Sequence, residues 1–579
     1  MKKRTLALIL ALVMVLSLGL TACGGSGDTT TTEPADTAGE PDTAPDAAPT
    51  DTAEKSTGYE DKTGIPVAYA TDVDKAVAYA EQFADFYNLA TPRDKLVVSA
   101  SQDGGGFEPT AIGSFGVLDW IFPKFVSLDS GGNLINIVAK SIVKQDDLTY
   151  RITIWENIVD TDGNPFTTSD VEFCFQKMVD AGRIDQANRY DHLEIIDDYT
   201  FDFCLNGDTD FGVGEMAANL GAVPLYTQAA CESHDFINDP VGIGGYMLKP
   251  GSYIPNSGFS VVTVDNWWFD EVKDQLPVIS LTCLRNVKEI EYKILTESSS
   301  RAIGLELGDL DICDALDLLD AENLISNGFQ KIQLPGNNTT AISFNSSEFS
   351  PCGDINLRMA ICYAIDNAAF AAGVNSPATP AYGMYPTVYD ALPEWSDPNA
   401  RDYYDYNVEK AKELLAESSY DGTPLKMMYT SMGVLPDTAL MVEAALREVG
   451  INVEHMQLEQ TVILVKMFDK TAFDFKIEAF GGPGGNYMPS RAKIFTAANN
   501  TQHFDNGEGI HMVASPDLDE LVYEIARTDR EDDIRAWDEL FTYEYCYGYG
   551  ILTADSITAA SADLNVCQDG AFVRFNACY

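Results

Sequence analysis

The residue types most often used in catalysis form no catalytic or metal-binding pattern in this sequence. The five histidines are His192, His234, His455, His503 and His511. They form no His-Glu-x-x-His or other close ligand pair, and there is no Gly-x-Ser-x-Gly motif, no phosphate-binding P-loop and no Cys-x-x-Cys pair. We therefore expect a protein that is not an enzyme and that holds no metal or cofactor, although carboxylates alone can catalyse hydrolysis.

The glycine-rich segment 481–485 has the composition of a phosphate-binding loop but lacks its functional residues. A P-loop needs Lys and then Ser or Thr after its glycines, and Asn486 and Tyr487 stand there instead. The segment offers backbone N–H groups that bulky side chains do not shield. Such groups suit an anionic or hydroxylated ligand.

The charge of the chain excludes one large class of function. Among 579 residues, 37 are Lys or Arg and 89 are Asp or Glu, which gives a formal net charge of −52 at pH 7. Because nucleic-acid binding and adhesion to anionic lipid both need clustered basic side chains, we expect neither. The length and the hydrophobic content of 45% predict roughly two to four packed units. The acidic surface favours a monomer.

The N-terminus has the order of features of a secretory signal. A positive stretch at 2–4 precedes an apolar run at 6–20, which is shorter than the ~20 residues that span a bilayer. The run ends in Leu-Thr-Ala-Cys at 20–23, which resembles a bacterial lipobox. This resemblance implies a signal peptide at 1–22 and a diacylglycerol anchor on Cys23. An ordinary signal peptide that ends near a cysteine is the alternative.

The segment after Cys23 is too polar to fold by itself. Residues 24–58 contain no aromatic residue and no Ile, Leu, Val or Met, and hold eight acidic residues against the single basic Lys55. We therefore expect residues 23–58 to form a flexible acidic tether. In the N-terminal extension 59–91, apolar residues at Val73, Val77 and Ala80 predict a helix.

The body of the chain alternates strand and helix patterns. Residues 149–155 predict a strand, and Thr167 and Ser169 can cap the helix that follows, with Asp170 and Glu172 favouring its start. Residues 425–430, 439–449 and 451–454 predict a strand, a helix and a strand. Since such βαβ units build mostly parallel sheets covered on both faces, the predicted fold class is α/β.

Cysteine usage does not indicate a disulfide framework. Ten cysteines follow Cys23, and Cys362 stands among the apolar residues of a predicted helix. A chain of this length does not need disulfides to fold, so we expect buried free thiols. Cys567 and Cys578 are the pair best placed for a disulfide.

Six ordered segments resemble one protein family. They are residues 147–154, 162–173, 240–248, 301–312, 344–366 and 405–415. For example, Asp-Gly-Asn-Pro-Phe-Thr at 162–167 is similar to the family's Asp-Gly-x-Pro-Leu-Thr. Pro-Val-Gly-Ile-Gly-Gly-Tyr at 240–246 is similar to its Pro-Val-Gly-Thr-Gly-Pro-Tyr. On these segments and the lipobox, the chain resembles the extracellular solute-binding proteins, family 5, of peptide and nickel ABC importers.

The resemblance implies a two-lobed α/β fold of the periplasmic-binding-protein type (type II, cluster C), with an extra subdomain in lobe I. By position, we expect lobe I with its subdomain at 92–295, lobe II at 296–505, and a return to lobe I at 506–579. In such proteins both lobes hold the ligand and close on it about a hinge.

The resemblance also implies a function. We expect a lipid-anchored, extracytoplasmic component of an ABC importer that captures an oligopeptide-like or other small polar solute. It would deliver the solute to a permease with its ATPase subunits, and would reach the membrane, at the periplasmic space or cell surface, only through its lipid anchor. Two alternatives stay open, namely a solute receptor for signalling and a surface hydrolase.

One departure from the family pattern concerns the ligand. Peptide-binding members hold the α-ammonium group with an Asp in a Gly-Trp-x-x-Asp-Tyr segment; here Phe480 replaces the Trp and Pro483 stands in place of the Asp. A buried cation needs a fixed anion. Ordinary peptides are therefore not the expected ligand unless another carboxylate, such as Asp103 or Glu108, replaces the missing one.

Ligands of open α/β sheets bind beyond the carboxyl ends of strands. The candidate ligand-binding residues therefore follow predicted strands or, for two tyrosines, lie on a Pro/Gly-rich loop. They are Ser101, Gln102, Asp103, Phe107, Asn345, Ser346, Ser347, Tyr382, Tyr385, Phe480, Asn486 and Tyr487.

Overall fold

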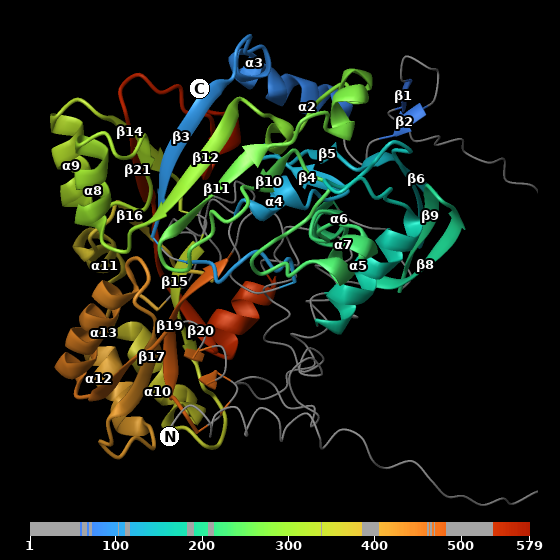
Figure 1. Cartoon of the computed structure of the whole chain (residues 1–579). Helices are drawn as coiled ribbons and strands as arrows, with labels where there is room; N and C mark the ends of the chain where they lie inside the picture. The colour runs from blue at the N-terminus through green and yellow to red at the C-terminus, as the bar shows by residue number, and fades with distance from the viewer. Residues whose placement is uncertain are drawn as a thin grey trace, which may run out of the picture. The chain divides into compact units, whose positions relative to one another are not determined.

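Two large mixed β-sheets and a smaller antiparallel sheet organise the chain in a computed structural model (Figure 1). The structure describes residues 58–60, 66–68, 72–101, 103–110, 116–181, 184, 190–206, 213–336, 338–384, 404–459, 462–463, 466–467, 469, 471–481 and 536–579. Helices pack against the sheets, so the predicted α/β class is confirmed. No helix of these ranges combines the length and the apolar content that a membrane span requires.

The N-terminal extension contains a short hairpin and a helical segment. β1 (Gly58–Glu60) pairs antiparallel with β2 (Pro66–Ala68). α2 (Val73–Ala80) begins at Asp72, whose carboxylate accepts two backbone hydrogen bonds of the first turn, and a 3₁₀ turn continues it into α3 (Ala84–Tyr87). The apolar face of α2 packs on Ile135 and Val278, which explains why this segment is helical.

The first large sheet has seven strands. In spatial order they are β10 (Tyr246–Leu248), β11 (Gly258–Thr263), β12 (Val287–Ile294), β3 (Arg93–Ala100), β13 (Ile312–Cys313), β21 (Ser556–Ala560) and β14 (Gln330–Leu334). β3 runs parallel to β12 and β13, and the other neighbours are antiparallel. α8 (Ser298–Glu306) and α9 (Leu318–Ser326) bury Leu305 and Leu324 in a cluster with Ile557 of β21.

A four-stranded antiparallel sheet lies between β3 and β10 in the sequence, where an extra subdomain was expected. Its spatial order is β6 (Ala139–Asp146), β7 (Thr149–Ile154), β9 (Thr200–Leu205) and β8 (Tyr190–Asp197). The neighbouring elements are α4 (Leu118–Ile121), β4 (Val126–Leu128), β5 (Leu134–Asn136), α5 (Thr168–Asp180), α6 (Val213–Leu220) and α7 (Gln228–Ser233). α5 starts at Thr167, one of the two predicted caps, which forms a capping box with Asp170.

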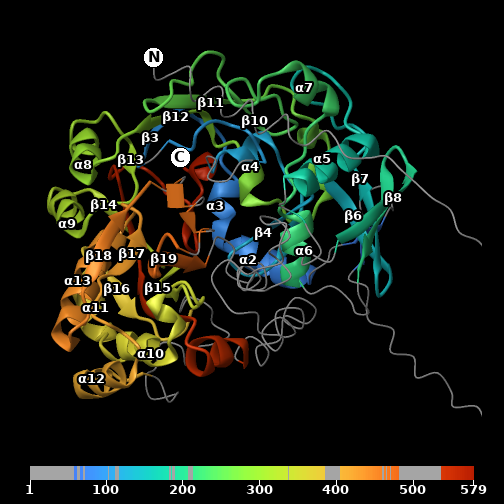
Figure 2. The same ribbon diagram turned by 90° about the horizontal axis from the view of Figure 1, so that it is seen from below.

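The second large sheet has six strands. In spatial order they are β16 (Ala378–Pro380), β20 (Gly548–Ala554), β15 (Asn338–Phe344), β19 (Phe475–Gly481), β17 (Leu425–Tyr429) and β18 (Val453–Gln457). Its helices are α10 (Ile355–Tyr363), α11 (Asn367–Gly373), α12 (Val408–Glu417) and α13 (Leu435–Val449). α13 packs on β17, β18 and β19, and α12 packs on α10 and α13 (Figure 2).

The predicted βαβ unit is confirmed, whereas the prediction of mostly parallel sheets is wrong. β17 and β18 are parallel, α13 connects them, and Gly450 ends the helix at φ 101°, a left-handed conformation that glycine adopts readily. β15 and β20, however, run antiparallel. β15 brings the chain from the first sheet and β20 leads back to it, so the two strands must run in opposite directions.

Within the described ranges, the chain passes between the two large sheets twice. It leaves the first sheet between Leu334 and Asn338, and returns at Asp555, which is the only residue between β20 and β21. The Asp555 carboxylate accepts hydrogen bonds from the Gly336 N–H (3.0 Å) and from Gln333 Nε2 (2.5 Å). One side chain therefore ties the two passages together.

These passages fall later in the sequence than the expected lobe boundaries at 295/296 and 505/506. Residues 298–334 still belong to the first sheet, because Ala302, Leu305 and Leu324 pack on β21 rather than on the second sheet. Likewise β20 still pairs with β15 in the second sheet. By sheet membership, the change occurs at 334–338 and again at 555.

Candidate functional site

The strand directions bring several carboxyl ends together in the first sheet. β12 and β13 are parallel to β3, so the last residues of the three strands, Ile294, Cys313 and Ala100, lie on the same side of the sheet. β14 ends there as well, since Leu334 pairs with Ser556 at the start of β21. We call this side, where the chain leaves for the other sheet, the exchange end of the first sheet.

The second sheet has a corresponding exchange end. β19 ends at Gly481 opposite Asn338, the first residue of β15. β17 and β18 run parallel to β19, so their last residues, Tyr429 and Gln457, lie toward the same end of the sheet as Gly481. In both sheets, therefore, the carboxyl ends of the mutually parallel strands lie on the side where the chain crosses. Open α/β sheets bind ligands beyond such ends.

Two of the predicted site residues lie at an exchange end. Ser101 directly follows β3 and is partly exposed. Phe480 is the penultimate residue of β19, pairs with Thr339 across the sheet, and is only 3% exposed. Gln102, Tyr385, Asn486 and Tyr487 lie outside the described residues, as do Cys23 and Pro483.

Asn345, Ser346 and Ser347 lie at the opposite end of the second sheet from Phe480. They follow β15, which runs antiparallel to β19, so its carboxyl end meets the amino end of β19. The Asn345 backbone N–H donates to the Asp474 carbonyl (2.9 Å), and its side-chain amide donates to the Phe473 carbonyl (2.8 Å). All three residues are buried. The carboxyl-end argument that nominated them holds only for parallel strands.

Asp103 and Phe107 pack within the first-sheet unit, by which we mean the first large sheet together with the elements that pack on it. The Asp103 carboxylate accepts hydrogen bonds from the Gly105 N–H (2.8 Å), the Tyr253 hydroxyl (3.2 Å) and the Asn256 N–H. Phe107 is fully buried, and its ring lies edge-on to Tyr253. Both side chains thus fix the loop after β3 against the β10–β11 connection.

Tyr382, the last described candidate, lies away from the exchange end of its sheet, and Glu108, named above as an alternative carboxylate, is engaged within its own turn. Tyr382 follows β16, and its carbonyl accepts a hydrogen bond from the Tyr543 hydroxyl (3.2 Å). The next residue, Gly383, contacts Gly550 in the middle of β20. Glu108 accepts hydrogen bonds from the N–H and the hydroxyl of Thr110 within its own turn.

Asp314, which the sequence analysis did not nominate, stands directly after β13 at the exchange end of the first sheet. Its carboxylate accepts a hydrogen bond from the Ser99 hydroxyl (2.8 Å) on β3. Burial raises its pKa, although the Ser99 hydrogen bond and the Arg301 charge act in the opposite direction. The sequence signal was available, because Asp314 follows the family-like segment 301–312.

Arg301 supports the chain around Asp314. It is 3% exposed, and its guanidinium donates to the carbonyls of Leu295 (2.7 Å), Thr296 (2.8 Å) and Asp314 (2.9 Å). The ends of β12 and β13 are thereby held together by one cation. Arg301 therefore positions the Asp314 backbone.

The exchange end of the second sheet carries polar groups of a different kind. The Tyr429 hydroxyl lies 2.9 Å from His455 Nδ1, and His455 Nε2 lies 3.2 Å from Glu443 on α13. Burial raises the pKa of Tyr429, so its hydroxyl stays protonated. Thr339 and Thr553, paired across β15 and β20, are buried, and their hydroxyls have no hydrogen-bond partner in the described structure.

No group of three or more His, Cys, Asp or Glu side chains able to hold a metal occurs within the described ranges. The polar groups at the two exchange ends include hydroxyls, backbone groups, the His455 imidazole and the carboxyl groups of Asp314, Glu443 and Asp555. This chemistry suits hydrogen bonding to a polar solute.

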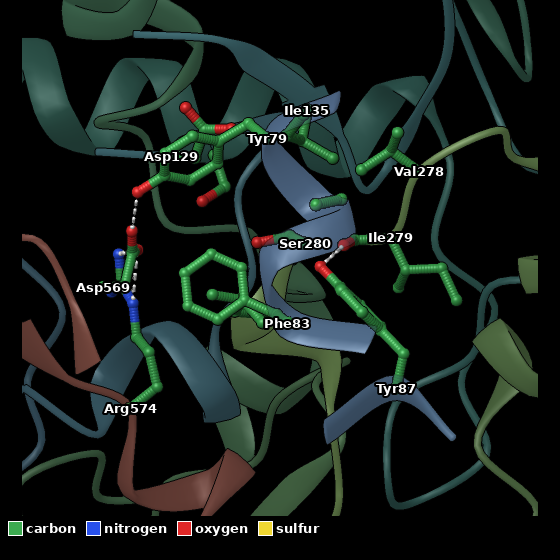
Figure 3. Close-up of a pocket in the computed structure, with 13 residues that line it drawn as sticks. Tyr79, Phe83, Tyr87, Asp129, Ile135, Val278, Ile279, Ser280, Asp569 and Arg574 are labelled. Atoms are coloured by element: carbon green, nitrogen blue, oxygen red, sulfur yellow. Dashed lines mark hydrogen bonds and ion pairs between the residues drawn. The ribbon is translucent and has the colours of Figure 1, made fainter. Parts of the chain in front are cut away.

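A separate pocket lies between the N-terminal extension and the first-sheet unit (Figure 3). Asp569 closes one side of it, accepting hydrogen bonds from the Tyr79 hydroxyl (2.8 Å) and from Arg574 (2.9 Å). Burial raises the pKa of Asp569, but the Arg574 charge and the hydrogen bonds outweigh burial and lower it. Tyr87 donates to the Ile279 carbonyl (2.7 Å) on the other side. These contacts attach the extension to the first-sheet unit.

Residues 133–502 match the family model described as bacterial extracellular solute-binding proteins, family 5, middle region. The probable D,D-dipeptide-binding periplasmic protein of Escherichia coli is 23% identical over 437 residues, which cover 71% of this chain and 78% of the relative. The nickel-binding periplasmic protein of E. coli is 22% identical, covering 60% and 68%.

Solved structures of two-lobed binding proteins share the fold. The periplasmic binding protein DppA of Helicobacter pylori, solved with the peptide STSA, matches with a TM-score of 0.70 at 17% identity, covering 84% of this chain and 98% of its own. The oligopeptide-binding protein AppA of Bacillus subtilis, solved with a nonapeptide, matches with a TM-score of 0.67 at 17% identity, covering 83% and 97%.

Proposed function

The chain belongs to the family 5 bacterial extracellular solute-binding proteins, and we propose that it is the lipid-anchored solute-binding component of an ABC importer. It would act as a monomer outside the cytoplasm, as a binding protein rather than an enzyme, and deliver its solute to a permease with its ATPase subunits. The observation that carries this proposal is the pair of sheets joined by two passages, with the carboxyl ends of parallel strands on the passage side in both.

The two passages are the proposed hinge. A solute that touches both exchange ends favours the arrangement in which both are in contact with it, and so shifts the population toward a closed form. Ser101 and Phe480 are the proposed ligand contacts of the two sides, together with the nominated residues Gln102, Asn486 and Tyr487. We do not carry forward Phe107, because its ring packs edge-on against Tyr253 of the β10–β11 connection.

We propose that the ligand is a small polar solute without a free amino terminus. The relatives are named for dipeptide or nickel binding and similar structures hold peptides, so family membership leaves the ligand class open. The Asp that would hold an α-ammonium group is replaced by Pro483. Asp103 already accepts three hydrogen bonds, which leaves Asp314 as the carboxylate best placed to replace the missing Asp.

A ligand panel tests this proposal. N-acetylated tripeptides and uncharged polar solutes should bind at least about tenfold more tightly than the same tripeptides with a free amino terminus, since an unpaired buried ammonium group is costly. Calorimetric titration measures the affinities, and native mass spectrometry of gently purified protein identifies any ligand that remains bound.

Asp314→Asn is the matched variant for the panel. It should leave the binding of N-acetylated tripeptides nearly unchanged. Tight binding of unmodified tripeptides that this variant abolishes would show that Asp314 takes over the missing role and that the proposed ligand class is wrong.

Anchoring at Cys23 has its own test. Without the thiol that receives diacylglycerol, Cys23→Ala should move the protein from the membrane fraction to the medium or periplasm. A carbonate wash followed by fractionation measures this change. Recovery of the variant in the washed membranes would contradict lipid anchoring at this residue.

A further inference from the structure

Two cysteines from distant parts of the sequence meet inside the second-sheet unit, which is the second large sheet together with its helices. Cys362 lies in the last turn of α10, and Cys546 stands two residues before β20. Their sulfur atoms are 3.6 Å apart, and both side chains are fully buried in the same apolar cluster. Sequence spacing gave no sign of this pair, because 184 positions separate the two residues.

The backbone around Cys546 is held in place from α10. Arg358, one turn before Cys362, donates to the carbonyls of Cys546 (2.8 Å), Tyr545 (2.8 Å) and Cys352 (2.7 Å). Cys546 itself has φ 50°, a left-handed conformation that is uncommon for a residue with a side chain. The buried arginine thus fixes the turn that directs the Cys546 sulfur toward Cys362.

The two thiols differ in acidity. Burial raises the pKa of Cys362 well above its ordinary value. For Cys546, burial acts in the same direction, but the hydrogen bond from the Cys362 thiol and the Arg358 charge outweigh it and lower the pKa. In the folded cluster Cys546 is therefore the more acidic thiol of the pair. A metal site is not an alternative among the described residues, where no suitable ligand group occurs.

We propose that Cys362 and Cys546 form a disulfide that staples α10 to the start of β20. The proposal rests on the proposed extracytoplasmic location, where protein or small-molecule disulfides act as the oxidant. One of the two thiolates attacks the oxidant disulfide, forms a mixed disulfide and expels one thiolate. The other cysteine then loses its proton, attacks the sulfur of the first and expels the second thiolate, so two electrons pass to the oxidant.

The geometry needs only a local change. A disulfide requires sulfur atoms about 2.05 Å apart, so the observed 3.6 Å must shorten through side-chain rotation. Because both thiols are inaccessible in the folded chain, the exchange occurs during folding, before the cluster closes. The staple would join the helix to the strand that leads to Asp555, and would restrict the unfolded chain over a long loop.

Peptide mapping tests the proposal. The chain carrying Cys23→Ala, which removes the anchor thiol, is folded with oxidised and reduced glutathione, alkylated in denaturant and digested without reduction. We expect a linked peptide pair containing Cys362 and Cys546, and two fewer thiols than the ten that follow Cys23. Reduction should lower the melting temperature by about 5 °C.

The control variants separate this pair from other thiols. Cys352 lies in the same cluster, so Cys352→Ala should keep the difference in melting temperature between oxidised and reduced protein. Cys362→Ala should abolish that difference. Ten free thiols after oxidative folding, or a link between Cys567 and Cys578 instead, would overturn the proposal. Peptide mapping of the chain that keeps both Cys362 and Cys546 tests the proposed disulfide even if one of these variants fails to fold. Ligand titration of the reduced protein tests the proposed function separately.

Discussion

His234 lies between two carboxylates in the first-sheet unit. Its Nδ1 is 2.8 Å from Asp239 and its Nε2 is 2.9 Å from Asp162. The hydrogen bond to Asp239 is the main cause that raises the pKa of His234; burial opposes it, and Asp162 adds to it. The protonated imidazole therefore links the turn after α7 to the acidic turn at 160–165.

This arrangement predicts a pH dependence of stability. Because its pKa is raised in the folded state, protonated His234 stabilises the fold. This stabilisation is fully present below the unfolded-state pKa of about 6.5 and is lost as the pH rises through the folded-state pKa. His234→Gln should therefore lower the melting temperature more at pH 6 than at pH 9. His192→Gln is the control, since His192 contacts one carboxylate and is largely exposed. An effect of His234→Gln that is the same at both pH values would contradict this account.

At the residue scale, the sequence predicted positions better than contacts. The positions of Ser101, directly after β3, and Phe480, near the end of β19, could be predicted because each depends on a strand with a local sequence signal. Phe107 was nominated for its place after a strand, but the loop folds back and buries its ring. The position of Asp314 could have been found from the family-like segment that precedes it, but its contacts with Ser99 and Arg301 form only in the folded chain.

The cysteines show the same difference between local and distant information. Burial of Cys362 could be predicted from its apolar neighbours, and the structure confirms it. Cys567 and Cys578, the pair that the sequence placed best for a disulfide, lie close together without being linked, and Cys578 Sγ accepts a hydrogen bond from the Cys567 N–H (3.4 Å). Sequence proximity favoured this pair, whereas only the folded chain brings Cys362 beside Cys546.

At the element scale, the first passage between the sheets depends on one glycine. A Cβ atom at Gly336 would lie 2.4 Å from the Ala554 carbonyl oxygen and 2.6 Å from the Thr553 side chain. The backbone carbonyl cannot move without disturbing β20, so any larger residue must push the two passages apart. Gly336 thus allows the strands to cross closely at the proposed hinge.

Gly336→Ala should therefore destabilise the protein by about 1–3 kcal/mol, as overpacking in a closely packed region does. Thermal unfolding measures the effect, and ligand affinity measured below the transition reports on the hinge. Gly116→Ala is the control, because a Cβ there meets nothing within 4 Å. Equal melting temperatures of the two variants would contradict the tight crossing.

Elements with local signals could be predicted, whereas the pairing of distant strands could not. The unit β17–α13–β18 has apolar periodicity, a helix end at Gly450 and a short path, and each of these is visible in the sequence. The direction of β15 relative to β20 depends on residues some 200 positions apart. The family-like segments also gave no sign that α8 and α9 would pack on β21 of the first sheet.

At the scale of the whole molecule, the net charge of −52 bears on the ligand. A strongly acidic surface repels anions at long range and slows their association, and this effect weakens as salt is added. The backbone N–H groups of the glycine-rich segment 481–485 suit both anionic and hydroxylated ligands, but the overall field favours the uncharged ones. An uncharged, hydrogen-bonding solute satisfies both conditions.

The central claim is that a ligand closes the molecule about the two passages. Small-angle scattering during titration with the ligand found in the panel tests it most directly. The radius of gyration should fall and level off at the same Kd that calorimetry gives, while the far-ultraviolet circular dichroism stays constant. At ~100 times Kd, binding should stabilise the protein by about 2.7 kcal/mol and raise the melting temperature by a few degrees. Saturating, stabilising binding with an unchanged radius of gyration would contradict closure about the hinge.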